Sequence, residues 1–151
     1  MIQHGHPAGP RGGIDLASAQ HAIDAVVSAA SARGVAVVVV VASASGDPIA
    51  LVRMDGVPPL AVESALRKCR TVAMTWGSTA SFAAALRSDL ETEPEFFHGM
   101  HHIGPLMTIG GGVPVVIDDA LVGAVAVSGA STADDVALAA VAASSISAEG
   151  R

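Results

Sequence analysis

The first apolar pattern along the chain is that of a helix. Apolar side chains between Leu16 and Ala30 are spaced by three and four residues, so they share one face of a helix. Asp15 is a residue type that caps helix starts, and Arg33 followed by Gly34 is a usual helix end. The pattern predicts one helix from about residue 15 to residue 33.

Two strands are predicted next. The β-branched run "VAVVVVVA" of residues 35–42 shows no polar alternation, which is typical of a strand covered on both faces. After the turn "SGDP", alternation returns and places Leu51, Arg53 and Asp55 on one face of a second strand.

A helix then begins at Pro58 or Pro59. Glu63 and Arg67 lie on its polar side, correctly ordered for an ion pair one turn apart. Its other side is a continuous apolar stripe of Val62, Ala65, Leu66, Cys69, Val72, Ala73 and Trp76.

Two further helices are expected before the next strands. One starts near Ser78 or Thr79. The other follows "TEPE", where Thr92 and Glu95 form a capping box, and should extend from Phe96 to His102.

The last third of the chain predicts a hairpin and a helix. The strands "VPVVID" and "ALVGAVAVSG" meet at Asp118 and Asp119, and a final helix begins at Ser131 or Thr132. Paired strands with helices grouped between them indicate an α+β fold with a mostly antiparallel sheet. We expect a flexible arm over residues 1–13 and a single domain over residues 14–148.

The composition of the chain argues against some classes of function. The net charge is −6 and aromatic residues make up 3% of the chain, which argues against nucleic-acid binding. No signal peptide is visible, and the longest apolar run is too short to span a bilayer. We therefore expect a soluble, cytoplasmic protein with no membrane partner. Cys69, the single cysteine, is expected to be a buried and inert thiol.

The stretch "FHGMHH" carries the strongest chemical signal. On a helix His98 shares a face with His101 or His102, which is the spacing that two imidazoles need to reach one metal ion. The three histidines are candidate acid–base catalysts, His98 and His102 are a candidate metal pair, and a solvated surface cluster is the plain alternative. Phe96 and Met100 are candidate ligand contacts beside them.

Two other segments supply candidate ligand-binding residues. Arg53 could hold a ligand carboxylate with Asp55 positioning it, although a structural ion pair between the two is as plausible. Glu63 is a further candidate contact. The run Gly110, Gly111 and Gly112 precedes a strand rather than a helix, so it is a poor phosphate loop. These glycines allow a tight bend or a close backbone approach to a ligand.

Two motifs resemble one known family. "LVRMDGVPPLAVESALRKCRTVAMTWGST" and "GGGVPVVIDDALVGAVAVSGASTADD" are similar to the opening and closing parts of the GlcG/HbpS family, also called the haem-degrading domain. The resemblance implies a profilin-like fold, with a five-stranded antiparallel sheet flanked by helices. It also implies assembly into homo-oligomers, from dimers to octamers. Asp118-Asp119 departs from the family's Asp-Gly turn, and "FHGMHH" lies in the family's variable region.

Three functions remain open at this point. The first is binding of haem or another tetrapyrrole, with or without its degradation, for which a clustered histidine would be the axial ligand. The second is an enzyme without an organic cofactor, an isomerase, lyase or decarboxylase, that acts on a small carboxylated metabolite with or without one divalent metal ion. The third is a self-assembling accessory protein without catalysis.

Overall fold

The computed structural model describes residues 12–100, 102–104 and 106–149 of the chain. Helices and strands follow one another as α1 (Leu16–Ala32), β1 (Val38–Ser43), β2 (Pro48–Arg53), α2 (Pro59–Thr75), α3 (Thr79–Thr92), α4 (Pro94–Met100), β3 (Gly112–Ile117), β4 (Ala120–Ser128) and α5 (Thr132–Glu149).

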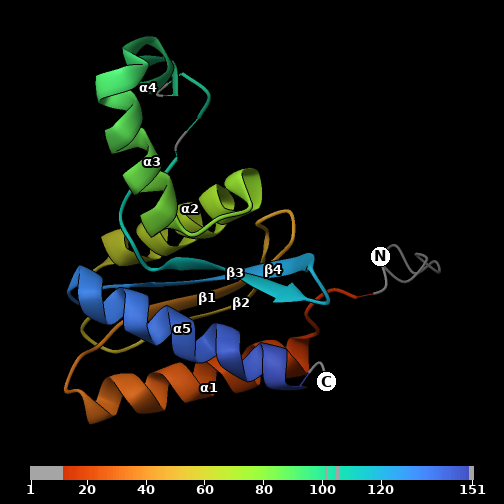
Figure 1. The fold of residues 1–151 in the computed structure, drawn as a ribbon. Coiled ribbons are helices and arrows are strands. Elements are labelled where there is room, and N and C mark those ends of the chain that lie inside the picture. Colours follow the sequence, from red (N-terminus) through yellow and green to blue (C-terminus); the bar gives the residue numbers. More distant parts are fainter. Residues whose placement is uncertain (1–11, 101, 105, 150–151) are drawn as a thin grey trace, which may run out of the picture.

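The strands form one antiparallel sheet in the order β2-β1-β4-β3. Helices α1 and α5 lie side by side on one face of the sheet, and α2 lies on the other (Figure 1). Helices α3 and α4 extend away from the sheet on the side of α2 (Figure 1). The α+β class and the antiparallel sheet expected from the sequence are confirmed.

The expected number of strands is wrong: the described residues form four strands, not five. Met107, between α4 and β3, contacts α2 instead of joining a sheet edge. The Met107 N–H donates to the Thr71 hydroxyl at 2.8 Å, and Thr71 is buried in α2. A backbone group that bonds a helix side chain is not available for a strand ladder.

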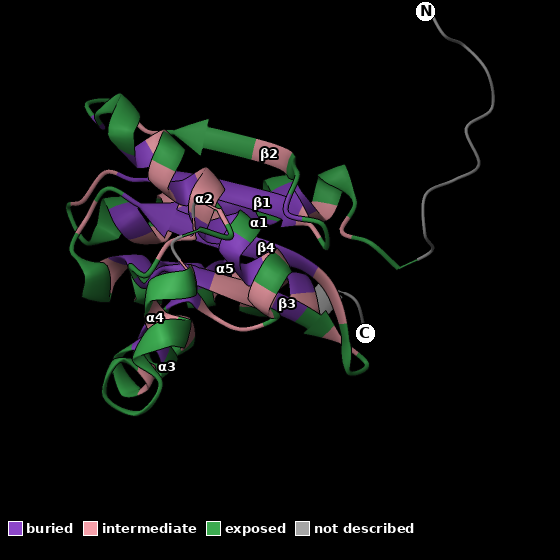
Figure 2. Ribbon diagram, turned by 90° about the horizontal axis from the view of Figure 1, so that it is seen from above, coloured by how far each residue is buried: buried purple, intermediate pink, exposed green. Residues whose placement is uncertain are grey.

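Strand β1 is buried on both faces, as its unbroken run of valines predicts. Val39 and Val41 pack in the cluster with α1 and α5, whereas Val38 and Val40 pack in the cluster with α2. All four side chains are fully buried. The edge strand β2 is mostly exposed, in contrast with β1 beside it (Figure 2).

The predicted helix ends of α1 are confirmed. The Asp15 carboxylate accepts a hydrogen bond from the Ser18 N–H at 2.8 Å, which satisfies a donor of the first turn. Arg33 is the C-terminal cap of α1, and Gly34 follows with a φ of 68°. The start predicted for α5 is also confirmed, because the Ser131 hydroxyl accepts from the Asp134 N–H at 3.1 Å.

Trp76 does not belong to the apolar stripe of α2, contrary to the sequence expectation. It caps the helix in the left-handed conformation, with a φ of 58°, and its side chain is 78% exposed. The reversal at Trp76 ends α2 at Thr75 and aims the indole outward, and Ser78 then caps α3. Cys69, in the middle of the stripe, is buried as predicted, and burial raises the pKa of its thiol to about 12.

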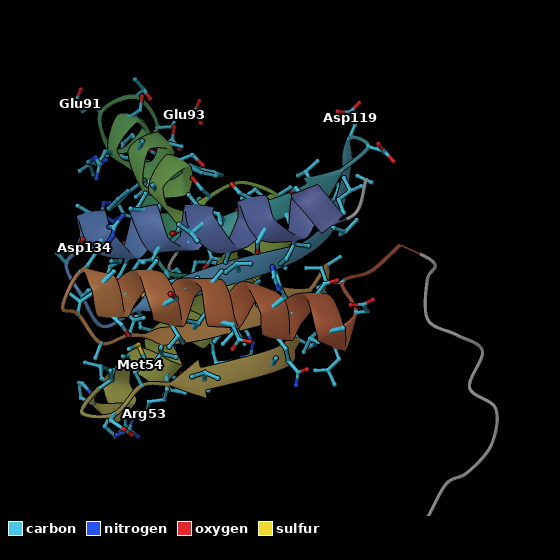
Figure 3. The ribbon with its side chains drawn as sticks, turned by 90° about the horizontal axis from the view of Figure 1, so that it is seen from below. Arg53, Met54, Glu91, Glu93, Asp119 and Asp134 are labelled. Atoms are coloured by element: carbon cyan, nitrogen blue, oxygen red, sulfur yellow. The ribbon has the colours of Figure 1, made fainter. Side chains whose placement is uncertain are left out.

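Asp118 and Asp119 form the two-residue hairpin loop between β3 and β4, as predicted, and Asp119 lies at the hairpin end of the sheet (Figure 3). Both residues have positive φ angles, of 48° and 61°. This loop matches the twist of the strands, but aspartate tolerates the left-handed region less well than glycine does.

We expect Asp119→Gly to stabilise the protein by a few tenths to about 1 kcal/mol, because glycine adopts this φ without steric cost. Urea unfolding of the two proteins measures the difference. Asp119→Ala is the matched variant and should lower stability. Equal midpoints for all three proteins would contradict a left-handed Asp119.

Candidate functional site

Helix α4, which carries His98, is defined at its start by proline. Pro94 disfavours helical backbone in the residue before it, and Glu93 has a φ of −140° and a ψ of 67°, which ends α3. Thr92 is still helical, and its hydroxyl donates to the Ser88 carbonyl at 3.1 Å. The capping box expected from Thr92 and Glu95 is therefore wrong.

None of the α4 side chains is buried. The helix packs mainly against α3 and forms the outer part of the projection seen in Figure 1. Phe96 is 49% exposed and Met100 is half-buried. In the turn after the helix Ile103 is 60% exposed. This projection presents apolar surface together with imidazole groups.

The histidines lie at the end of this projection. His98 is exposed, and the Phe97 ring meets it edge-on with centroids 5.4 Å apart. Helix α4 spans Pro94–Met100 rather than the predicted Phe96 to His102, so it begins and ends earlier along the chain than expected. His102 is exposed in the following turn, where its N–H donates to the Gly99 carbonyl at 3.0 Å. His101 lies outside the described residues.

The part of the chain that the structure describes holds no group of three or more His, Cys, Asp or Glu side chains that could bind one metal ion. A metal bound by His98 and His102 stays a prediction, as does catalysis by these histidines.

Arg53 and Asp55 lie elsewhere, at the end of β2. The Arg53 Nε donates to the Val57 carbonyl at 2.6 Å, and among the described residues no ion pair joins Arg53 to Asp55. Figure 3 shows Arg53 on the opposite side of the molecule from Glu91 and Glu93, which mark the projection of α3 and α4. One chain therefore does not bring Arg53 to the histidines.

Glu63 forms the ion pair that its spacing predicts. Its Oε1 lies 2.8 Å from the Nε of Arg67, one turn along α2, and both side chains are largely exposed. An exposed pair of this kind contributes at most a fraction of a kcal/mol to stability. A ligand role for Glu63 stays a prediction.

The three glycines are buried against protein rather than open to a ligand. A Cβ on Gly110 would lie 2.8 Å from the Val136 side chain, and one on Gly112 would lie 2.8 Å from the Thr79 methyl group. Gly111 has a φ of 113°, and its Cβ would lie 2.7 Å from the Val127 carbonyl oxygen. The close backbone approach that the sequence predicted is thus an approach to the core.

Gly111 and Gly112 pack against Lys68. It lies on α2, its side chain is fully buried, and its Nζ donates to the Val127 carbonyl at 2.7 Å and to Asp135 Oδ2 at 3.2 Å. The other Asp135 oxygen accepts from the Ala130 N–H at 3.1 Å. A Cβ on Gly111 would lie 2.9 Å from the Lys68 Nζ. Every polar atom of the pair is satisfied by protein.

Burial shifts the pKa values of both Lys68 and Asp135. Desolvation lowers the pKa of the Lys68 ammonium, and the Asp135 carboxylate opposes that shift. Desolvation likewise raises the pKa of Asp135, and Lys68 opposes it. The hydrogen bonds on both sides support the ionised pair.

Sequence reasoning missed this pair. Neither Lys68 nor Asp135 was singled out from the sequence. The position of Lys68 in the sequence could have indicated that it is buried. Lys68 lies three residues after Ala65 and four before Val72, so it shares the buried face of α2 with them.

One surface hollow of about 200 Å³ lies at the far end of the sheet from α4, lined by Gly13, Ile14, Asp15, Ser18, Ile117, Val122 and Ile146. Pockets for drug-sized ligands usually have about 300–1,000 Å³. This hollow is therefore too small to enclose a tetrapyrrole.

Comparison with known proteins assigns the family. The model of the haem degrading, HbpS-like family matches residues 14–144. This chain belongs to the HbpS-like family. No sequence among the curated proteins matches significantly. No helix among the described residues of this HbpS-like chain is long and apolar enough to cross a membrane.

Solved structures agree with the family in fold. The Klebsiella pneumoniae protein ORFY is 27% identical with a TM-score of 0.82, over 97% of this chain and 99% of its own. HbpS is 28% identical with a TM-score of 0.76, over 95% and 97% of the two chains. The haem complex of PduOC is 24% identical with a TM-score of 0.75, over 88% and 94%, and shows likeness of fold.

In this HbpS-like chain Lys68→Met should destabilise the fold by about 3–5 kcal/mol, because it leaves the Asp135 carboxylate buried without a counter-charge. Lys68→Met/Asp135→Asn removes both charges and keeps an acceptor for the Ala130 N–H, so it should cost less than Lys68→Met alone. Urea unfolding gives both values. A double variant less stable than Lys68→Met would show that the charges do not depend on each other.

Gly111→Ala should lower the free energy of unfolding by about 2–4 kcal/mol, because the methyl group overlaps a carbonyl and the Lys68 ammonium at an unfavourable φ. Gly99→Ala is the matched control. Gly99 lies in α4 with open space around its Cβ position, and alanine there should be neutral or stabilising by up to about 1 kcal/mol. Thermal unfolding distinguishes the two variants, and equal melting temperatures would contradict the close packing at Gly111.

Proposed function

We propose that this chain binds haem and that the α4 projection supplies the axial ligand. Family membership over residues 14–144 is the observation that carries the proposal. The PduOC structure, which is a haem complex, adds support through its fold. His98 is the leading candidate ligand because it is exposed on α4, a helix that has no buried residue.

The residues of the projection fit a haem. Imidazole is a common axial ligand of haem iron, and porphyrin needs apolar contact area beside it. Phe96 and Ile103 expose that area, and Met100 is half-exposed between them. When bound, haem would supply an iron centre for redox or ligand-binding chemistry.

The buried glycines have no part in this proposal. Gly110, Gly111 and Gly112 are occupied by packing against Lys68, Thr79 and Val136, so their backbone does not line a free site. The ligand surface consists instead of α4 and the turn that ends at Ile103.

Haem degradation stays a prediction, and so do the alternatives of a small-molecule enzyme and of an accessory protein without catalysis. The enzyme hypothesis combined a histidine acid–base with Arg53 as a carboxylate anchor. Within one chain, Arg53 lies on the opposite side of the molecule from the projection of α3 and α4 (Figure 3). The geometry of one chain therefore does not support a site that combines Arg53 with these histidines.

A haemin titration of the purified protein tests the proposal. We expect a saturable, red-shifted Soret band at about one haem per chain, because an imidazole that ligates haem iron alters its absorption. His98→Ala should weaken haemin binding by at least about tenfold, whereas His102→Ala reports on the second exposed imidazole of the projection.

His21→Ala is the matched control, because His21 is also exposed but lies on α1. Binding that is lost in His21→Ala and kept in His98→Ala and His102→Ala would place the haem elsewhere and refute the α4 site. Absence of a saturable Soret shift in the unmodified protein would refute haem binding itself.

A further inference from the structure

The surface hollow between the start of α1, the β3–β4 hairpin and the end of α5 has no part in the proposed haem site. Aliphatic side chains form most of its wall, namely Ile14, Ile117, Val122 and Ile146. Ile14 lies over Gly123, in the space that a side chain at this position would occupy, and it packs against the core cluster of the sheet. The wall is therefore held in place by close packing from below.

The volume of the hollow suits one small organic molecule. An apolar cavity of about 150 Å³ is large enough to bind benzene. The hollow has about 200 Å³, which leaves room for a ring of that size and one short polar group. Contact of the ring with the aliphatic wall removes apolar surface from water and so favours binding.

The polar part of the wall is acidic. Asp15 and Ser18 line the hollow at the start of α1, and the Ser18 N–H donates to Asp15 Oδ1 at 2.8 Å. This hydrogen bond holds the pKa of the Asp15 carboxyl below its ordinary value, so the group is ionised at neutral pH. A carboxylate has about four acceptor sites, so Asp15 can also accept a hydrogen bond from a ligand.

The surroundings of the hollow favour positive charge. Ile146 lies in the last turn of α5, where the backbone carbonyl groups form the negative end of the helix dipole and no basic residue lies among the described ones. Asp118 and Asp119 directly follow Ile117 in the hairpin loop. Within the described ranges, the residues that line the hollow include no Lys, Arg or His. At the start of α1 the Asp15 carboxylate would repel an anion.

We propose that this hollow binds a small organic cation, in which an ammonium group is attached to a compact apolar body. The apolar body lies against the aliphatic wall, and the ammonium group donates to the Asp15 carboxylate. A hydrogen bond between two charged groups is about twice as strong as one between neutral groups. A neutral molecule of the same shape loses this gain, and an anion meets the Asp15 charge.

Benzylammonium is the probe that tests the proposal, titrated into the purified protein without haem and followed by the amide signals in solution NMR. We expect saturable shifts confined to the amides around the hollow, those of residues 13–18, 117–122 and 146. Benzyl alcohol and benzoate have nearly the same shape, and each should bind at least about threefold more weakly.

Asp15→Asn tests the charge. Asparagine caps a helix start as well as aspartate does, so α1 should remain intact. The variant should weaken benzylammonium binding by at least about threefold and leave binding of benzyl alcohol unchanged. Asp24→Asn is the matched control, because Asp24 is an exposed carboxylate on the same helix that does not line the hollow. It should bind benzylammonium as the unmodified protein does.

Val122→Phe tests the location. Val122 is half-buried in the wall, and a phenyl ring there would fill the hollow and abolish saturable binding. Val116→Phe is the matched control. Val116 is 46% exposed on β3 beside Ile117, and successive side chains of a strand point to opposite faces, so this ring should not affect binding.

Equal or tighter binding of benzyl alcohol or benzoate would refute the preference for a cation, as would equal weakening by Asp15→Asn and Asp24→Asn. Shifts that centre on α4, shifts that persist in a folded Val122→Phe variant, or the absence of saturable shifts would refute the hollow as the binding site. If Val122→Phe does not fold, the comparison of Asp15→Asn with Asp24→Asn decides.

Discussion

The buried ion pair of Lys68 and Asp135 is the constraint on which the centre of the structure depends. Lys68 lies on the helix that covers one face of the sheet, and Asp135 lies in the first turn of α5 on the other face. Their side chains meet at 3.2 Å, and Lys68 also bonds the carbonyl of Val127 near the end of β4. Two buried charges are tolerated only where they pair and their other hydrogen bonds are satisfied. The pair therefore fixes α2, β4 and α5 relative to one another.

The glycine run follows from the same constraint. The chain must pass the Lys68 ammonium on its way into β3, and any side chain at Gly111 would overlap the Lys68 Nζ and the Val127 carbonyl. The Gly111 carbonyl then accepts the Val127 N–H at 2.9 Å, which starts the pairing of β3 with β4. A motif that resembles a ligand loop in sequence is thus explained by packing around a charge that lies 43 residues earlier in the chain.

Local chemistry made most of the fold predictable. Asp15, Ser78 and Ser131 mark helix starts by bonds to residues three positions on, and the Asp118–Asp119 loop is a two-residue turn, so each signal lies within a few residues. The errors arose where a second local signal or a distant contact decided the outcome. Pro94 ended α3 and removed the capping role of Thr92, and Thr71 bound the backbone of Met107, so that segment formed no fifth strand.

The site was less predictable because it depends on distances between segments. Spacing correctly predicted a short helix that carries His98, but no local pattern could tell that Arg53 lies on the far side of the molecule from that helix (Figure 3). For the same reason, the sequence pattern did not reveal that Lys68 is buried. A charge on a helix is normally solvated, and only its partner on α5, 67 residues away, makes burial acceptable.

The small side chains of the core explain why function is expected at the periphery. The buried residues are mostly alanine and valine, which allow helices and sheet to approach closely. At Gly123 a single added Cβ would overlap the Ala42 carbonyl and the side chain of Ile14. A core packed in this way has no spare volume for a tetrapyrrole, since interiors are close-packed and large voids are costly. Binding surface must then come from an element that extends beyond the layers, and in the described chain the exposed projection of α3 and α4 is such an element (Figure 2).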